Sequence, residues 1–149
     1  MFKSPLKDFK IVPGLGTVAA GQTDQTTIAV DTTGYEGCIF LAYMGAITGG
    51  AATSLQAAQC ATSGGSYNDL AGSSVVIADT DDNKVAALDI YRPSKPFLKA
   101  TVKRATQNSV INGVIAILYN TRKYPVAQDT TNYVVSTSKV LGSPAEGTP

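Results

Sequence analysis

Short apolar runs separated by turn-forming residues are the feature that most constrains the fold of this chain. The clearest run is 97–104, in which Leu98, Ala100 and Val102 alternate with Lys or Thr residues. An apolar residue at every second position predicts a β-strand with one buried and one exposed face. Residues 84–91 repeat the alternation, so the same kind of half-buried strand is predicted there.

Two further runs are apolar on both faces of the predicted strand. Residues 37–44 read Gly-Cys-Ile-Phe-Leu-Ala-Tyr-Met, and residues 114–119 read Val-Ile-Ala-Ile-Leu-Tyr after Asn112-Gly113, a turn dipeptide. Strands of this kind are central in a sheet or have their second face covered. Either another subunit or the N-terminal segment covers that face, or both strands lie centrally beneath loops.

Segment 51–61 is ambiguous because its Ala, Leu and Gln residues also favour helices. It has no capping box and contains Thr and Cys, which favours a strand. Further short strands are predicted at 27–30, 74–78 and 133–139. Seven or eight strands without a strong amphipathic helix predict an all-β fold: a single-domain β-sandwich, jelly-roll-like in type.

The first 25 residues differ from the rest of the chain. Pro5, Pro13 and three glycines are mixed there with scattered apolar residues. An extended N-terminal arm is therefore predicted for residues 1–25, rather than a helix. The sandwich domain is predicted for residues 26–149, and it ends in a tail of small residues at 142–149.

The composition agrees with a folded, weakly charged domain. Of the 149 residues, 44% are apolar, 15% are charged and 14 are glycine. The net charge of +1 provides no long-range field for nucleic acid or an anionic membrane, so neither is an expected partner. No apolar stretch has the length of a signal peptide core or a membrane span. Cys38 and Cys60 lie among apolar or small residues and are predicted to be free buried thiols.

Most catalytic and metal-binding chemistry lacks its usual residues. The chain has no histidine, which removes the commonest general base and the commonest metal ligand. We therefore expect no enzymatic activity, no cofactor and no metal. Asp79, Asp81 and Asn83 have the spacing that opens a calcium loop, but Lys84 and Ile90 stand where that loop needs Gly and Glu. A solvated turn whose side chains bond the local backbone is predicted instead.

Charged residues elsewhere suggest no specific site. The basic residues of the second half are Lys95, Lys99, Lys103, Arg104, Arg122 and Lys123. They are predicted to form a solvated outer face, because a nucleic-acid-binding sheet normally adds several aromatic platforms. The carboxylates considered for a glycosidase pair are Glu36, Asp69, Asp89 and Glu146. They are scattered over different segments, so no pair is inferred.

Several blocks of sequence together resemble small virion proteins of tailed bacteriophages, described as head decoration (cement) or structural proteins. The blocks are residues 26–31, 34–40, 88–93, 114–119 and 143–148, the third reading Leu-Asp-Ile-Tyr-Arg-Pro. The likeness covers about residues 25–149. It implies a protein made in the bacterial host cytoplasm that binds the outer surface of the capsid, often as a homotrimer, and stabilises the shell.

The resemblance makes the major capsid protein the expected partner. On the predicted arm, Phe2, Leu6 and Phe9 are expected to be apolar anchors. Further interface residues are expected at Ile11, Tyr119, Arg122 and Tyr124.

Two alternatives stay open. One is a head–tail adaptor or a tail or fibre component of the same virion. The other is a glycan-binding β-sandwich for host attachment that uses Tyr67, Tyr124 or Tyr133.

Overall fold

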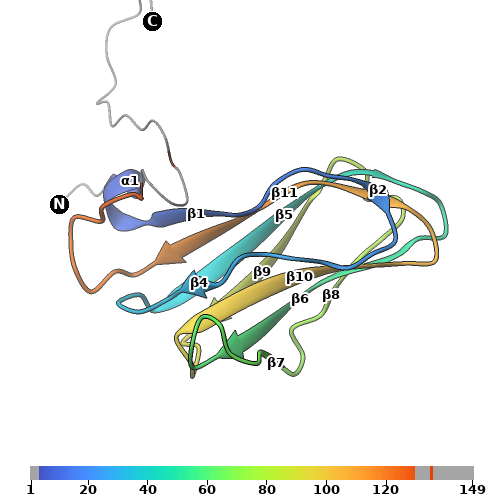
Figure 1. Cartoon of the computed structure of the whole chain (residues 1–149). Helices are drawn as coiled ribbons and strands as arrows, with labels where there is room; N and C mark the ends of the chain where they lie inside the picture. Colours follow the sequence, from blue (N-terminus) through green and yellow to red (C-terminus); the bar gives the residue numbers. More distant parts are fainter. Residues whose placement is uncertain (1–3, 130–134, 136–149) are drawn as a thin grey trace, which may run out of the picture.

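The computed structural model describes residues 4–129 and 135, which form two packed sheets and one short helix (Figure 1). The elements are α1 (Pro5–Asp8), β1 (Lys10–Leu15), β2 (Val18–Gly21), β3 (Gln25–Thr26), β4 (Val30–Asp31), β5 (Gly37–Ile47), β6 (Ala52–Cys60), β7 (Asn68–Asp69), β8 (Val75–Ile77), β9 (Val85–Tyr91), β10 (Phe97–Ala105) and β11 (Ser109–Tyr119). Within the described residues the helix is four residues long, and no helix is long and apolar enough to cross a membrane.

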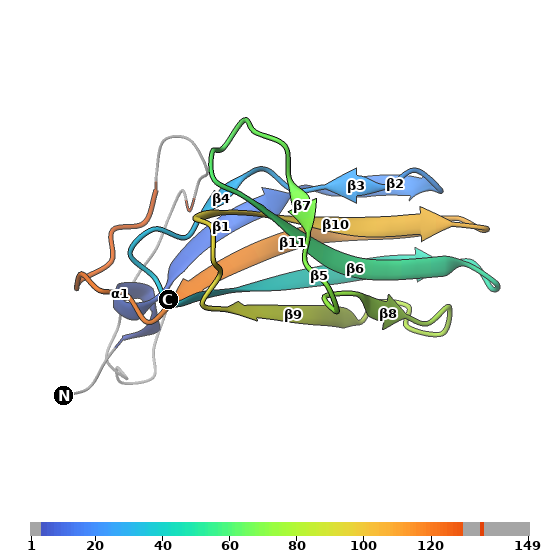
Figure 2. The same ribbon diagram turned by 90° about the horizontal axis from the view of Figure 1, so that it is seen from below.

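The two sheets are antiparallel and lie face to face, as Figure 2 shows from below. Sheet A has the order β1-β11-β5-β9, with β2 also paired to β11. Sheet B has the order β3-β10-β6-β7, with β4 paired to β10 and β8 paired to β6. The chain crosses repeatedly between the sheets, and this strand order is that of a jelly roll. The predicted β-sandwich is confirmed, including strand β6 in the ambiguous segment.

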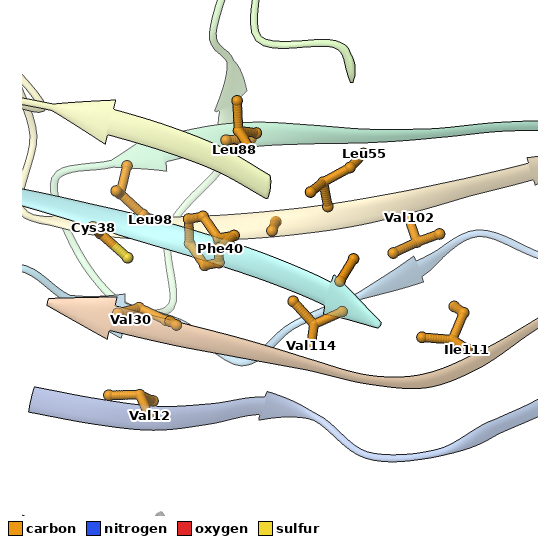
Figure 3. Close-up of a cluster of buried hydrophobic side chains, with 14 of the residues drawn as sticks. Val12, Val30, Cys38, Phe40, Leu55, Leu88, Leu98, Val102, Ile111 and Val114 are labelled. Carbon is orange, nitrogen blue, oxygen red and sulfur yellow. The ribbon is translucent and has the colours of Figure 1, made fainter. Parts of the chain in front are cut away.

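The core consists of the inward-facing residues of both sheets. The alternation predicted for β10 is confirmed, because Leu98, Ala100 and Val102 are all buried. They face sheet A, where Phe40 of β5 and Val114 of β11 are fully buried (Figure 3). Both strands predicted to be doubly apolar are therefore central strands of sheet A.

The prediction of an N-terminal arm over residues 1–25 is wrong for residues 10–25. Strand β1 pairs with β11, β2 pairs with β11, and β3 pairs with β10. The sandwich therefore begins at Lys10, and residues 5–8 form one helical turn instead of extended chain. Pro13 suggested a break, but β1 is an edge strand, where a proline leaves no ladder bond unmade.

A second correction concerns Asn112-Gly113, which was predicted to be a turn before a strand. Both residues lie inside β11, where the pairing with β5 shifts register between Ile111 and Gly113. Gly113 has φ of 158°, and the strand continues on both sides. Asn and Gly suit a β-bulge as well as a turn, and the local sequence does not separate the two.

A third correction concerns Arg104, which was predicted to lie on a solvated face. Its side chain is only 4% exposed and continues the inward series of β10. The guanidinium donates to the carbonyl oxygens of Ala19 (2.9 Å), Thr23 (2.7 Å) and Ser109 (2.7 Å). Arg104 thus joins sheet B to strands β2 and β11 of sheet A.

Both cysteines are buried free thiols, as predicted. Burial is the main cause that raises the pKa of Cys38 to about 12, so this thiol stays protonated at neutral pH. At Cys60 the pKa is lowered, chiefly by the backbone N–H of Thr62.

Candidate interaction surface

The outer surface of sheet A is apolar across its four main strands. The register places Pro13, Ile115, Leu41 and Ala87 in one row and Ile11, Ile117 and Ile39 in the next. A third row adds Tyr43 and Val85. We call these nine residues the apolar face. The charged side chain in these rows is Asp89, on edge strand β9.

Several side chains of the apolar face are open to solvent. Tyr43 is 47% exposed, Ile115 is 45% exposed and Val85 is 57% exposed. The outer face of an antiparallel sheet is normally polar, so this row of apolar side chains is not required by the fold. Exposed apolar patches of this kind mark protein interaction sites.

The structure narrows the alternatives for the second face of β5 and β11. The described part of the N-terminal segment does not lie over this face, because β1 extends the sheet sideways beside β11. The exposure of Tyr43 and Ile115 shows that the described loops do not cover them either. Another protein surface is the remaining candidate among the covers considered.

Tyr119 forms a rigid border at one end of the apolar face. Its ring lies over Gly37, where an added Cβ would overlap the Tyr119 side chain. Its hydroxyl donates to Oδ1 of Asp89 at 2.6 Å and so spans three strands of sheet A. Burial, followed by this hydrogen bond, raises the pKa of Tyr119, so the phenol stays protonated.

A groove of about 750 Å³ lies at the same end of the sandwich. Its walls are Phe9 from the N-terminal segment and Asn120, Thr121, Arg122 and Tyr124 from the chain after β11, together with Asp8 and Glu36. Phe9 is 38% exposed and Tyr124 is 46% exposed, so both rings are accessible. We call this feature the end groove.

Gln128 holds the two walls of the end groove together. Its Nε2 donates to the carbonyl oxygens of Leu6 (3.1 Å) and Phe9 (2.6 Å), and its Oε1 accepts from the N–H of Ile11 (3.0 Å). The N–H of Val126 also donates to the carbonyl of Lys7. Side chains nearly 120 residues apart in sequence therefore form one site.

The charges of the end groove are partly compensated. Both oxygens of Glu36 are occupied, one by Arg92 Nη2 (3.4 Å) and one by Asn120 Nδ2 (3.1 Å). The N–H of Arg122 donates to the carbonyl of Gly34, which positions the residue. Its guanidinium makes no ion pair or hydrogen bond with the part of the chain that the structure describes. A cation and two accessible rings are thus available to a partner.

The structure brings most of the predicted interface residues to one end of the molecule. Phe9, Arg122 and Tyr124 line the end groove. Ile11 belongs to the apolar face, and Tyr119 borders it.

Leu6 and Phe2 are the two remaining predicted interface residues. Leu6 is half-buried on α1, and Phe2 lies outside the described residues, as do Tyr133, the strand predicted at 133–139 and the tail at 142–149. Sequence reasoning did not name Ile115, Leu41 or Tyr43. The signal was the doubly apolar pattern of their strands.

The acidic turn behaves as a structural turn. The N–H groups of Gly50, Ala78 and Ile47 donate to Asp79, Asp81 and Asp82, respectively. The bond to Ala78 is local, and the other two brace the neighbouring connection between β5 and β6. Within residues 4–129 and 135 no three His, Cys, Asp or Glu side chains are grouped to hold a metal ion.

Of the three tyrosines considered for glycan binding, the two that the structure describes lie on separate surfaces. Tyr124 lines the end groove, whereas Lys99 of sheet B places its Nζ 4.4 Å from the ring centroid of Tyr67. The Tyr67 hydroxyl also donates to the carbonyl of Ser63. The ring of Tyr67 already has a cationic partner.

Comparison with known proteins places the chain in no family. No family model matches, and no curated protein matches. Among solved structures, the chain is similar to the CBM22-1–GH10 modules of endo-1,4-β-D-xylanase 10B from Clostridium thermocellum, solved with xylohexaose. The identity is 11% and the TM-score is 0.42, over 78% of this chain and 28% of the xylanase chain. A likeness at this level carries no information on function.

Proposed function

We propose that this chain is a structural virion protein that binds the outside of a phage capsid as an oligomer and stabilises the shell. The observation that carries the proposal is the exposed apolar face of sheet A. The sequence resemblance suggests the capsid as the partner, and the apolar face is a surface that a protein partner could cover. Interface cores are depleted in charge, and the nine residues of this face are all uncharged.

The size of the apolar face suits a repeated, weak contact. Four strands over six residue steps cover roughly 20 Å by 20 Å, or roughly 400 Å². A standard protein interface covers about 800 Å² on each partner, so one such contact is weak. On a closed shell the contact repeats, and effective concentration multiplies its strength. This is the behaviour that a decorating protein needs.

The end groove adds a second contact beside the first. Tyr and Arg are over-represented among the residues that dominate binding energy at interfaces. Tyr124 meets this description, and Phe9 adds a further exposed ring. In this proposal the major capsid protein contacts the apolar face and inserts a side chain into the groove.

Co-sedimentation with empty shells tests the proposal. Ile115 and Leu41 are directly opposite each other on the outer face of sheet A, and Thr101 and Gln56 are opposite each other on that of sheet B. We expect Ile115→Lys with Leu41→Lys to abolish saturable binding. Thr101→Lys with Gln56→Lys adds the same charge to the other sheet and should bind like the wild type.

Three outcomes would contradict the proposal. Equal binding by both double variants would remove the apolar face as the docking surface. Wild-type protein that ignores shells but joins purified tails or the head–tail vertex would favour the adaptor or tail reading. Saturable sugar binding by a monomer that ignores both would favour attachment to a host glycan.

A further inference from the structure

The two ends of the sandwich carry opposite charges. Strands β5 and β9 pair so that Gly37 faces Tyr91 at one end and Tyr43 faces Val85 at the other. The loops at 32–36 and 92–96 therefore lie at the first end, and the turn at 78–84 lies at the second (Figure 2). The first end holds a basic pocket, and the second holds the acidic turn.

The basic pocket has a volume of about 490 Å³. Arg92, Lys95 and Arg122 line it together with a single carboxylate, Glu36, so three cations against one anion leave a net charge of +2. Glu36 is already paired with Arg92. The side chains of Lys95 and Arg122 make no ion pair with the described residues. These two cationic groups are therefore available to bind an anionic partner.

Backbone hydrogen bonds hold the walls of this pocket in place. The N–H of Arg92 donates to the carbonyl of Glu36 at 2.7 Å, and the N–H of Arg122 donates to that of Gly34 at 2.8 Å. Thr32 donates both its N–H and its hydroxyl to the carbonyl of Pro96, each at 2.8 Å. A pocket that is already formed loses little entropy when it binds.

The acidic turn is equally well ordered. Asp79, Asp81 and Asp82 are fixed by the N–H groups of Gly50 (2.6 Å), Ala78 (2.9 Å) and Ile47 (2.7 Å), the three donors named above. Lys84 pairs with Asp81, so three carboxylates against one ammonium leave a net charge of −2. The turn is anionic, its residues are exposed or half-buried, and its charge complements that of the pocket.

We propose that the acidic turn of one copy docks into the basic pocket of a second copy, so that the chains associate head to tail. This contact would build the oligomer that the proposed function requires, and the inference rests on that proposed function. A contact between two different surfaces closes into a ring when the rotation permits, and otherwise continues as a filament. A closed ring of three copies would place the apolar faces at equivalent positions.

Solution mass as a function of salt is the first test. The full-length wild type should associate in 20 mM salt, and its dissociation constant should rise about tenfold or more in 500 mM salt, because exposed charges are screened. A wild type that stays monomeric at millimolar concentration in low salt would overturn the proposal. So would association that is indifferent to salt.

Paired charge-neutral variants locate the contact. Lys95→Gln with Arg122→Gln removes two cations of the pocket, and Asp79→Asn with Asp82→Asn removes two anions while keeping the oxygen acceptors for the backbone. Each double variant should weaken association roughly tenfold, as expected for the loss of two exposed charge pairs. Lys99→Gln with Lys103→Gln removes two cations from the outer face of sheet B and should associate like the wild type.

A mixture of the two defective variants gives the decisive result. Each variant keeps one intact surface, so an equal mixture should form dimers at concentrations where either variant alone is monomeric. Absence of mixed dimers would overturn the head-to-tail contact. If the acid-depleted variant associates like the wild type, the turn is not the occupant of the pocket. Shell co-sedimentation of the apolar-face variant is measured separately, so failure of this contact and failure of the capsid proposal remain distinguishable.

Discussion

The two sheets of the sandwich share one construction on their inner faces and differ on their outer faces. In β10 of sheet B, the inward Leu98 and Ala100 alternate with the outward Lys99 and Thr101. In β11 of sheet A, the inward residues alternate with outward isoleucines such as Ile115. The inward residues of both sheets form the hydrophobic core. The packing between the sheets does not require apolar residues on the outer face of sheet A.

The outer face of sheet B also shows how such a surface is stabilised in water. Lys103 pairs with Asp24 at 2.9 Å, and the hydroxyls of Thr26 and Thr101 are 2.9 Å apart. Lys99 lies over the ring of Tyr67. Polar groups on this face interact with one another, whereas the apolar face of sheet A has few polar groups to interact.

The largest expected effect separates the inner face of sheet A from its outer face. Phe40 is fully buried between the sheets, so Phe40→Ala should lower the free energy of unfolding by about 4 kcal/mol through lost burial and a cavity. Ile115→Ala removes a half-exposed side chain from the same sheet and should cost about 1 kcal/mol or less. Urea unfolding of both variants measures the difference. Equal losses would mean that the outer residues are needed for folding.

A somewhat smaller loss is expected at the buried cation of sheet B. Arg104→Met leaves the carbonyls of Ala19, Thr23 and Ser109 without this donor, which should cost about 3 kcal/mol of unfolding free energy. Lys103→Met, one residue earlier and facing outward, is the matched control and should cost less than about 1 kcal/mol. Chemical denaturation compares them, and a tolerant Arg104 would contradict its role in joining the sheets.

Packing of Tyr119 against Gly37 should have a moderate effect. Gly37→Ala adds a Cβ that displaces the Tyr119 ring and breaks its bond to Asp89, at a cost of about 1–2 kcal/mol. Tyr119→Phe keeps the ring and removes the hydroxyl, so it should cost about half as much. Thermal unfolding of the two variants ranks them. A larger loss in Tyr119→Phe would show that the hydrogen bond matters more than the ring position.

The smallest effect is a difference in pH response between the sheets. On sheet B, hydrogen bonding to Lys103 lowers the pKa of Asp24. The ionised Asp24 therefore adds to the free energy of unfolding above about pH 4, the pKa of Asp in the unfolded chain, and this contribution is lost as the pH falls further. On sheet A the pKa of Tyr119 is raised, so its stabilisation is present below about pH 10 and is lost as the pH rises further.

Two conservative variants check these opposite pH limits. Asp24→Asn should flatten the acid limb of the stability curve, and Tyr119→Phe should flatten the alkaline limb. Unfolding free energy measured from pH 2 to pH 11 separates them. The assignment fails if Tyr119→Phe changes the acid limb, or if Asp24→Asn leaves that limb unchanged. Asp24→Asn also affects the alkaline limb, because the hydrogen bond to Asp24 raises the pKa of Lys103.

Local pattern was sufficient for most of the fold. The period of two in residues 97–104 predicted both the strand and its buried side, because alternate side chains of a strand must point to opposite faces. The doubly apolar runs likewise predicted strands in the middle of a sheet, which β5 and β11 are. The sandwich class follows from these runs and from the turns between them.

Partners distant in sequence decided what local pattern did not. Residues 10–21 pair with β11, about a hundred residues later, and nothing near Pro13 indicates that an edge strand accepts it. Arg104 is buried because three carbonyls from other segments surround it. The end groove exists because Gln128 binds the N-terminal segment.

The sequence by itself determined that this protein is an all-β sandwich with a surplus of outward apolar residues, because strand periodicity and residue type are local properties. The tertiary structure alone decided that those residues form one continuous face, and that the groove and the charged ends occupy defined places around it. Register and strand order make those arrangements, and both depend on contacts between segments that the chain keeps far apart.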